Sequence, residues 1–185
     1  MILDRFKLTD RIAIVTGAGR GIGRGIALGF AEAGAHLVCA ARTRAQIEAT
    51  AELVRERGGR ALAVECDVLE TEQLDALVAA TLAEFGRIDI LQNNAGIGSG
   101  DAGPTRLTEA AWDQTFDTNL KSVFLTCKHV LPVMRDQQGG CITNISSVAA
   151  VCGVGIVAYK TSKAGVNAFT HALATGNARF GIRAN

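Results

Sequence analysis

A glycine-rich segment near the N-terminus constrains the fold of this chain more than any other feature. Ile12–Thr16 is an apolar run rich in β-branched residues, and residues 17–23 contain four glycines. Ile22–Ala33 then has the apolar spacing of a helix and stops at Gly34, a residue suited to the position after a helix end. The segment therefore predicts a strand, a tight turn and a helix in direct succession, which is the first half of a β-α-β unit.

The glycines of this turn predict a phosphate-binding loop. Gly17 can make the tight reversal, Gly21 lets backbone approach a diphosphate, and Gly23 lets the helix pack against the strand. Gly19 completes the pattern, while Arg20 and Ile22 lie between the glycines. The N-terminal end of the following helix offers unpaired N–H groups and a positive dipole end. A merely flexible turn is the alternative, but the strand and helix on either side favour dinucleotide binding.

The rest of the chain continues the alternation of strands and helices. We expect further strands at 36–41, 61–66, 88–92 and 140–145. Helices are expected at 44–57, 71–85, 109–116 and 158–180, with a longer helix that follows the one at 109–116 and reaches about residue 134. This alternation predicts an α/β fold with a doubly wound, Rossmann-like parallel sheet of strand order 3-2-1-4-5. Ligands bind such sheets at the carboxyl ends of the strands near the switch point, here between strands 1 and 4. We expect residues 1–185 to form one domain.

Composition narrows the class of protein further. The formal net charge of +1 predicts no attraction to nucleic acid or membrane surfaces, and no apolar run reaches membrane-spanning length. The first ten residues lack the apolar centre of a signal peptide, so we expect a cytoplasmic protein. The five cysteines are not spaced as CxxC and are expected to be buried free thiols. The three histidines are scattered and predict no metal site.

A serine, a tyrosine and a lysine carry the candidate chemistry. Tyr159 and Lys163 are four residues apart and so lie one turn from each other on the same helix face. An ammonium group held there favours the phenolate, which makes Tyr159 a candidate acid or base near neutral pH. Ser146 can reach the same place from the end of a strand, with Ser147 as its competitor. Singly, each could equally be a surface residue or a local cap.

The cofactor preference follows from the end of the second strand. An NAD site usually has an acidic residue about 20 residues after the glycines, where it binds the ribose 2′-hydroxyl. Here Arg42, Thr43 and Arg44 occupy that region, and the next acid is Glu48. Arg42 can bind a 2′-phosphate through its planar guanidinium, with help from Arg20. We therefore predict NADP(H), with NAD as the alternative if Arg42 and Arg44 are only solvated surface residues.

Five motifs in sequence order give the chain a resemblance to the short-chain dehydrogenase/reductase family, of the 3-oxoacyl-carrier-protein reductase type. They are Thr16–Gly23, Cys66-Asp67-Val68, Asn93–Gly96, Asn119 within Asp117–Leu120, and Asn144–Ser147 ahead of the Tyr159/Lys163 pair. The resemblance implies an oxidoreductase that transfers a hydride between a nicotinamide cofactor and a ketone or secondary alcohol. The thirteen-residue spacing to the tyrosine in that family favours Ser146 over Ser147.

The resemblance also implies a role for each residue. Tyr159 would be the general acid in reduction, and Lys163 would support it and hold the nicotinamide ribose hydroxyls. Ser146 would bind the substrate oxygen, and Asn119 would order a water that relays protons to Lys163. The residues that would border the cofactor are Asp67 and Val68 at the adenine, and Asn94, Ala95 and Gly96 at the ribose.

The resemblance sets expectations for the end of the chain. In the family, the segment at Gly181–Asn185 opens a sixth strand, which a cofactor-contacting loop, a substrate lid and a seventh strand follow. We therefore expect a chain truncated at its C-terminus, with the sixth and seventh strands missing or incomplete and the strand at 140–145 as the edge of the sheet. The apolar residues after Ser146, which are Val148, Cys152, Val154 and Ile156, favour a modest apolar substrate pocket, although they could equally serve packing.

Two further expectations concern partners and alternative functions. The helices at 109–134 and 158–180 resemble those that form a four-helix bundle between subunits in the family, so we expect a homo-oligomer, either a dimer or a tetramer. The alternatives to an NADP-dependent reductase are an NAD-linked alcohol or sugar dehydrogenase of the same family and a catalytically weak dinucleotide-binding protein. Turnover with a carbonyl or alcohol substrate would distinguish an enzyme from a binding protein.

Overall fold

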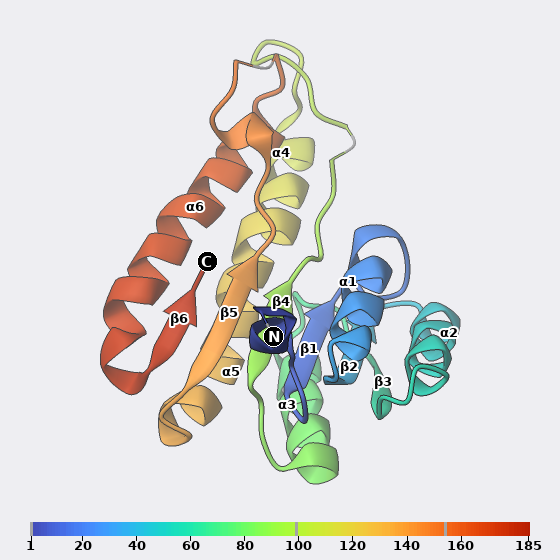
Figure 1. Cartoon of the computed structure of the whole chain (residues 1–185). Helices are drawn as coiled ribbons and strands as arrows, with labels where there is room; N and C mark the ends of the chain where they lie inside the picture. The colour runs from blue at the N-terminus through green and yellow to red at the C-terminus, as the bar shows by residue number, and fades with distance from the viewer. Residues whose placement is uncertain (1, 99, 154) are drawn as a thin grey trace.

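The computed structural model describes residues 2–98, 100–153 and 155–185. Six parallel strands form one sheet in the order β3-β2-β1-β4-β5-β6. The strands are β1 (Ile12–Thr16), β2 (His36–Ala41), β3 (Ala61–Glu65), β4 (Ile90–Asn93), β5 (Gly140–Asn144) and β6 (Ile182–Ala184). The predicted order of the first five strands is confirmed, and Figure 1 shows them side by side below the upper ends of α4 and α6.

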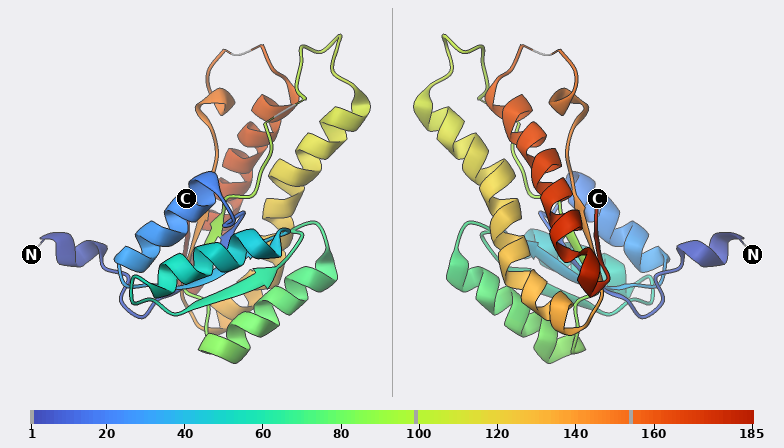
Figure 2. Two further views of the ribbon diagram at one scale, coloured as in Figure 1. Left: turned by 90° about the vertical axis from the view of Figure 1, so that its right-hand side faces the viewer. Right: turned by 90° about the vertical axis from the view of Figure 1, so that its left-hand side faces the viewer.

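Helices cover both faces of the sheet because its central strands are apolar on both sides. In β1, Ala13 and Val15 pack with α1 and α2, whereas Ile14 packs in a second core with α3, α5 and α6. Figure 2 shows these two helical layers on opposite faces. The helices are α1 (Gly21–Glu32), α2 (Arg44–Arg55), α3 (Thr71–Phe85), α4 (Glu109–Phe116), α5 (Ser122–Asp136) and α6 (Ala158–Asn177), with short 3-10 turns at Ile2–Phe6, Val148–Ala150 and Ala178–Phe180.

The expectation that the strand at 140–145 forms the sheet edge is wrong. Gly181 adopts a left-handed conformation (φ +68°) after α6, which turns the chain back so that β6 pairs with β5. The backbone N–H of Asn144 donates to Asn185 O at 2.8 Å, and that of Asn185 donates to Ile142 O at 2.9 Å, which extends the pairing by two more bonds. A strand of only three residues thus covers the backbone edge of β5, consistent with an incomplete sixth strand.

The continuous helical segment from α4 to α5 and the helix α6 form the upper part of the molecule in Figure 1. α4 continues into α5 through a π-helical turn at Asp117–Lys121, and α6 runs for 20 residues before a 3-10 turn. Their N-terminal parts extend past the carboxyl ends of the strands, beside the loops after β4 and β5 (Figure 1). Asn177 is the last residue of α6, and its side chain donates to Leu173 O at 2.8 Å and accepts from Arg135 Nε at 2.9 Å.

A buried chain of polar side chains fixes the strands beneath the upper loops. Asn93 on β4 donates to Asn144 on β5 at 2.9 Å, and Thr126 on α5 donates to Asn93 at 2.7 Å. Asn144 then donates to Thr170 on α6 at 2.8 Å. Because each buried amide has a partner, the network holds β4, β5 and both helices in one register.

The expectation of buried free thiols holds for three of the five cysteines. Cys39, Cys66 and Cys127 are buried, and burial raises the pKa of their thiols to about 12, 11 and 12 respectively. Cys141 is half-buried, while Cys152 is exposed, so the expectation of a buried thiol is wrong there. Within the described ranges, no helix combines the length and the apolar character that a membrane span requires.

Candidate active site

The glycine turn after β1 has the conformation that its sequence predicts. Gly17 and Gly21 have φ values of +66° and +53°, which are accessible to glycine and strained for most other residues. A Cβ atom at Gly23 would overlap the carbonyl oxygen of Gly17, so this glycine allows α1 to approach the turn. At Gly21 a Cβ would meet open space, so the backbone there is accessible to a ligand.

The loop after β4 is bonded to this turn. The hydroxyl of Thr16 accepts the backbone N–H groups of Asn94 at 3.0 Å and Ala95 at 3.1 Å. The Asn94 side chain in turn donates to Thr16 O at 3.1 Å. β1 and β4 are neighbours in the sheet, so the two loops meet at the predicted switch point.

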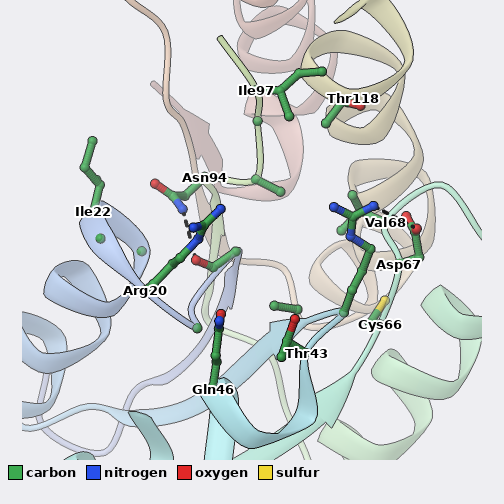
Figure 3. Close-up of a pocket in the computed structure, with 18 of the residues that line it drawn as sticks. Arg20, Ile22, Thr43, Gln46, Cys66, Asp67, Val68, Asn94, Ile97 and Thr118 are labelled. Carbon is green, nitrogen blue, oxygen red and sulfur yellow. Dashed lines mark hydrogen bonds and ion pairs between the residues drawn. The ribbon is translucent and has the colours of Figure 1, made fainter. Parts of the chain in front are cut away.

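A cavity of about 710 Å³ lies where these loops meet, at the carboxyl ends of the strands. Its volume falls within the range of small-molecule and cofactor sites. Figure 3 shows Arg20, Ile22 and Asn94 at one end and Cys66, Asp67 and Val68 at the other. The predicted residues that line it are Gly17, Gly19, Arg20, Gly21, Ile22, Gly23, Arg42, Asp67, Val68, Asn94, Ala95 and Gly96.

Sequence reasoning missed several other lining residues. Thr43 and Gln46 belong to the start of α2, and Thr118 immediately precedes Asn119. Thr43 is the N-cap of α2 with an extended backbone, and its side chain caps no backbone N–H. For Thr43 and Thr118 the available signal was their position next to Arg42 and Asn119, whereas Gln46 follows no marked residue directly.

Arg42 and Asp67 face each other at the β2–β3 end of the cavity. Their closest nitrogen and oxygen atoms are 3.8 Å apart, and the Arg42 side chain is 75% exposed. Asp67 also accepts the backbone N–H of Leu69 at 3.1 Å, which fixes its carboxylate. The exposed guanidinium therefore remains available to an anion, although a carboxylate lies beside it.

The cavity fits a dinucleotide on grounds of shape and donors. The glycine turn and the start of α1 offer backbone N–H groups at one end, and the Arg42 guanidinium lies at the other. Apolar lining at Val68, Leu69 and Ile97 suits the face of a flat ring. The residues present thus match a ligand with an anionic centre and planar ends.

Lys163 lies just behind the cavity wall. The residue is 4% exposed, and Nζ donates to the backbone carbonyl oxygen of Ile145 at 2.7 Å. A Cβ built on Gly96, which lines the cavity, would lie 3.6 Å from Nζ. Burial lowers the pKa of Lys163, because removal from water disfavours the ammonium form.

Asn119 is fully buried in the π-helical turn between α4 and α5. Its side chain pairs with the backbone of Ile97, accepting from the N–H at 2.8 Å and donating to the carbonyl oxygen at 2.9 Å. It also donates to Ser162 on α6 at 3.2 Å. A single π turn inside a helix is frequently found at a functional site, and here it directs Asn119 toward both the cavity loop and α6.

The two serines after β5 have different partners. The hydroxyl of Ser146 donates to the backbone carbonyl of Lys163 at 3.3 Å, which places Ser146 against α6. Ser147 instead caps the short turn Val148–Ala150, accepting the N–H of Ala149 at 3.1 Å. The local cap occupies Ser147, whereas the contact of Ser146 is with the helix that carries Tyr159.

Tyr159 lies in the first turn of α6, and Lys163 Nζ is 5.9 Å from the centroid of its ring. A Cβ at Gly98 would be 3.6 Å from the ring, so the loop after β4 passes close to the phenol. The backbone N–H of Tyr159 donates to the Asp101 carboxylate at 2.6 Å. Asn119, Ser146, Tyr159 and Lys163 are thus gathered around the N-terminal half of α6.

Asp101 caps α6 from a distant loop and was not predicted. Its carboxylate also accepts the N–H groups of Val157 at 3.0 Å and Ala158 at 3.2 Å, beside its local contact with Ala102. Burial opposes ionisation of Asp101, but these backbone N–H donors prevail and hold its pKa below the ordinary value. The capping carboxylate is therefore ionised at neutral pH.

The apolar residues expected to line a substrate pocket are only partly described. Val148 is 71% exposed, Cys152 is also exposed and Ile156 is half-buried. Val154 lies outside the described residues. Lys160 Nζ bonds the carbonyl oxygen of Cys152 at 2.6 Å, which holds this loop beside α6.

Comparison with known proteins gives a consistent result. The model of the family described as short chain dehydrogenase matches residues 11–185. A 3-oxoacyl-[acyl-carrier-protein] reductase of Synechocystis sp. is 39% identical over 180 residues, which cover 96% of this chain and 72% of that protein. The (2S)-[(R)-hydroxy(phenyl)methyl]succinyl-CoA dehydrogenase subunit BbsD of Thauera aromatica is 39% identical over 178 residues, covering 96% of this chain and 71% of that protein.

Solved structures agree with the sequence comparison. A crystal structure of a short-chain type dehydrogenase/reductase from Mycobacterium marinum superposes with a TM-score of 0.95 at 35% sequence identity. The alignment covers 100% of this chain and 76% of that one. The similarity thus extends over the whole sheet and both helical layers.

Proposed function

The chain belongs to the short-chain dehydrogenase family, and from this premise we propose that it reduces a ketone or oxidises a secondary alcohol with NADP(H). The observation that carries the proposal is the position of Lys163. Its buried ammonium group lies behind Gly96 in the cavity wall and beneath the ring of Tyr159. One buried cation is therefore close both to the expected cofactor site and to the expected proton donor.

Tyr159 is the proposed general acid in reduction. A nicotinamide cofactor, when bound, supplies or accepts a hydride. The substrate oxygen then needs a proton, and the phenol is the proposed donor, with the Lys163 ammonium 5.9 Å from the centroid of its ring. Ser146 is proposed to donate a hydrogen bond to the same oxygen, which stabilises the charge that develops on it. These roles need no metal ion.

Asn119 and Lys163 are proposed to form the proton path, and Lys163 is proposed to contact the nicotinamide ribose as well. Asn119 is held by Ile97 and Ser162, so its amide is fixed relative to α6. This rigidity suits the ordering of a water between Asn119 and Lys163. Arg42, with Arg20, is proposed to bind the 2′-phosphate of NADP, and Asp67, Val68 and the 94–96 loop to border the adenosine and ribose.

We extend the proposal to the assembly. The described residues form one sheet with its two helical layers, which we propose to be a single dinucleotide-binding and catalytic domain. Phe124 on α5 is 47% exposed and contacts the ring of Phe169 on α6, with centroids 6.2 Å apart. Phe124 is exposed and Phe169 is half-buried, and an exposed aromatic residue at this position supports a homo-oligomer built through α5 and α6. Sedimentation showing a monomer at micromolar concentration would contradict this part.

The test of the proposed reaction is NADPH oxidation by the purified protein with a panel of ketones and 3-oxoacyl thioesters. Replacement of Tyr159 by Phe should lower kcat by about a hundredfold or more, because the proton donor is lost. The Kd for NADPH should be largely unchanged, since the ring remains. Full turnover by Tyr159→Phe would refute the role of Tyr159, and cofactor binding without turnover by the wild-type protein would indicate a binding protein instead.

A further inference from the structure

The carbonyl oxygens of the glycine turn have specific partners on the side away from the cavity. The Arg24 guanidinium on α1 donates to Gly19 O at 2.5 Å. The hydroxyl of Thr50 on α2 is 3.0 Å from Ala18 O. Two consecutive peptide groups of the turn are therefore held by side chains from two different helices.

Arg24 and Thr50 also bond each other. Arg24 Nε donates to Thr50 Oγ1 at 3.0 Å, so the hydroxyl proton points elsewhere and is shared between Ala18 O and Gln46 O. Thr50 is fully buried, and Arg24 is half-buried. Arg24 makes no ion pair with a carboxylate in the described part of the chain. Its guanidinium donates to the turn and to Thr50, which itself bonds the turn, and a charge-assisted bond is stronger than a neutral one.

The orientation of the carbonyls decides the orientation of the amides. In a planar trans peptide, the C=O of one residue and the N–H of the next point in opposite directions. Bonds to Ala18 O and Gly19 O therefore direct the N–H groups of Gly19 and Arg20 away from α2 and Arg24. Neither N–H has a backbone partner among the described residues, and both residues line the cavity. Such fixed, unpaired N–H groups are what an anion requires.

The remaining contacts of the turn make this arrangement rigid. Ala18 N donates to Ala40 O of β2 at 3.2 Å, and Gly17 is packed against Asn94 and Gly23. The turn is thus tied to β2, α1, α2 and the loop after β4. Without Arg24, Gly19 O would lose its side-chain donor, and only the shared proton of Thr50 would restrain the preceding peptide, through Ala18 O, from that side.

We propose that Arg24 and Thr50 are positioning residues of the diphosphate site, which orient the N–H groups of Gly19 and Arg20 toward the cofactor diphosphate. This inference rests on the proposed function, since it supposes that the cavity takes a dinucleotide. Neither side chain contacts the cofactor in this role. Their effect is on the backbone donors, and it is confined to the diphosphate part of the ligand.

The experiment measures affinity rather than turnover. The Kd for NADPH is measured by fluorescence titration, and that for 2′-AMP, which lacks the diphosphate, by calorimetry. Arg24→Met and Thr50→Val should each weaken NADPH binding, the first by about tenfold or more, and leave 2′-AMP binding unchanged. The matched control is Arg57→Met, which also removes an arginine linking α1 to α2, through Glu32 and Leu53 O, at the opposite end of the helices.

Each outcome decides the proposal. An unchanged NADPH Kd in both variants would overturn it, and so would an equal loss for NADPH and 2′-AMP, which would indicate a general disturbance of the cavity. Arg24→Lys keeps the charge but replaces the two donor nitrogens of the planar guanidinium by one ammonium nitrogen, so weaker NADPH binding is expected, and full affinity in that variant would also overturn positioning by the guanidinium. A wild-type protein that binds neither NADPH nor NADH would refute the proposed function itself, which is a separate result.

Discussion

The Asp101 carboxylate accepts the backbone N–H of Tyr159 at 2.6 Å, although the two residues are 58 positions apart. The same carboxylate holds the N–H groups of Val157 and Ala158. The N-cap position of α6 itself, Val157, has no side chain able to cap. Asp101 thus fixes both the first turn of α6 and the loop that runs from the cavity past Tyr159.

Removal of this cap should destabilise the protein and impair catalysis. Asp101→Ala should lower the free energy of unfolding by roughly 1–2 kcal/mol, the range seen for lost helix caps, and Asp101→Asn by less because an acceptor remains. A lower kcat is expected in both, since Tyr159 loses its backbone anchor. Urea denaturation and steady-state kinetics measure the two effects. Asp113→Asn, an exposed acid on α4, is the control, and equal behaviour of Asp101→Ala and this control would contradict the assignment.

Cofactor preference should depend on Arg42. Arg42→Asp places a carboxylate beside Asp67, so the two acids repel the 2′-phosphate of NADP and favour a ribose hydroxyl. The ratio of kcat/KM for NADPH to that for NADH should fall by at least about tenfold, which corresponds to about 1.4 kcal/mol. An unchanged ratio, or a wild-type preference for NADH, would refute the prediction of NADP.

The two glycines Gly23 and Gly25 should respond oppositely to the same substitution. A Cβ at Gly23 would overlap the carbonyl of Gly17, so Gly23→Ala must displace the turn and should cost several kcal/mol or abolish dinucleotide binding. A Cβ at Gly25 meets nothing within 4 Å, so Gly25→Ala should stabilise α1 by about 0.5–1 kcal/mol. Thermal unfolding of both variants measures the contrast. Equal melting temperatures would show that α1 does not pack as described.

The buried Lys163 should make stability depend on pH in the alkaline range. Burial lowers its folded-state pKa, whereas the unfolded chain keeps the ordinary value of about 10.4. Between these two values the unfolded state binds more protons, so this residue makes stability rise with pH. Lys163→Met lacks the group, and the difference in unfolding free energy between wild type and variant should change with pH only in that window. Parallel pH curves for the two proteins would exclude a perturbed Lys163.

Local patterns predicted those parts of the site that are contiguous in the chain. The turn from Gly17 to Gly23 needs particular backbone angles, and glycines at fixed spacing mark them directly. Tyr159 and Lys163 could be paired because helical geometry alone sets their separation. The strand at 140–145 was misjudged as an edge because the three residues of β6 are too short for a periodic signal. Asp101, Arg24 and Thr50 carry no recognisable pattern, since each bonds backbone groups of another element.

The sequence by itself determined the order of strands and helices and the glycine turn, because these depend on side-chain periodicity and on the conformational freedom of glycine within short segments. The resemblance to the family rested on five short motifs that can be read along the chain. The tertiary structure alone decided which elements meet at the carboxyl end of the sheet. It placed Lys163 behind Gly96, set Asp67 beside Arg42 and directed Asp101 to the start of α6. Such contacts join residues far apart in the chain, and they form only when the buried sheet and its two helical layers bring those residues together.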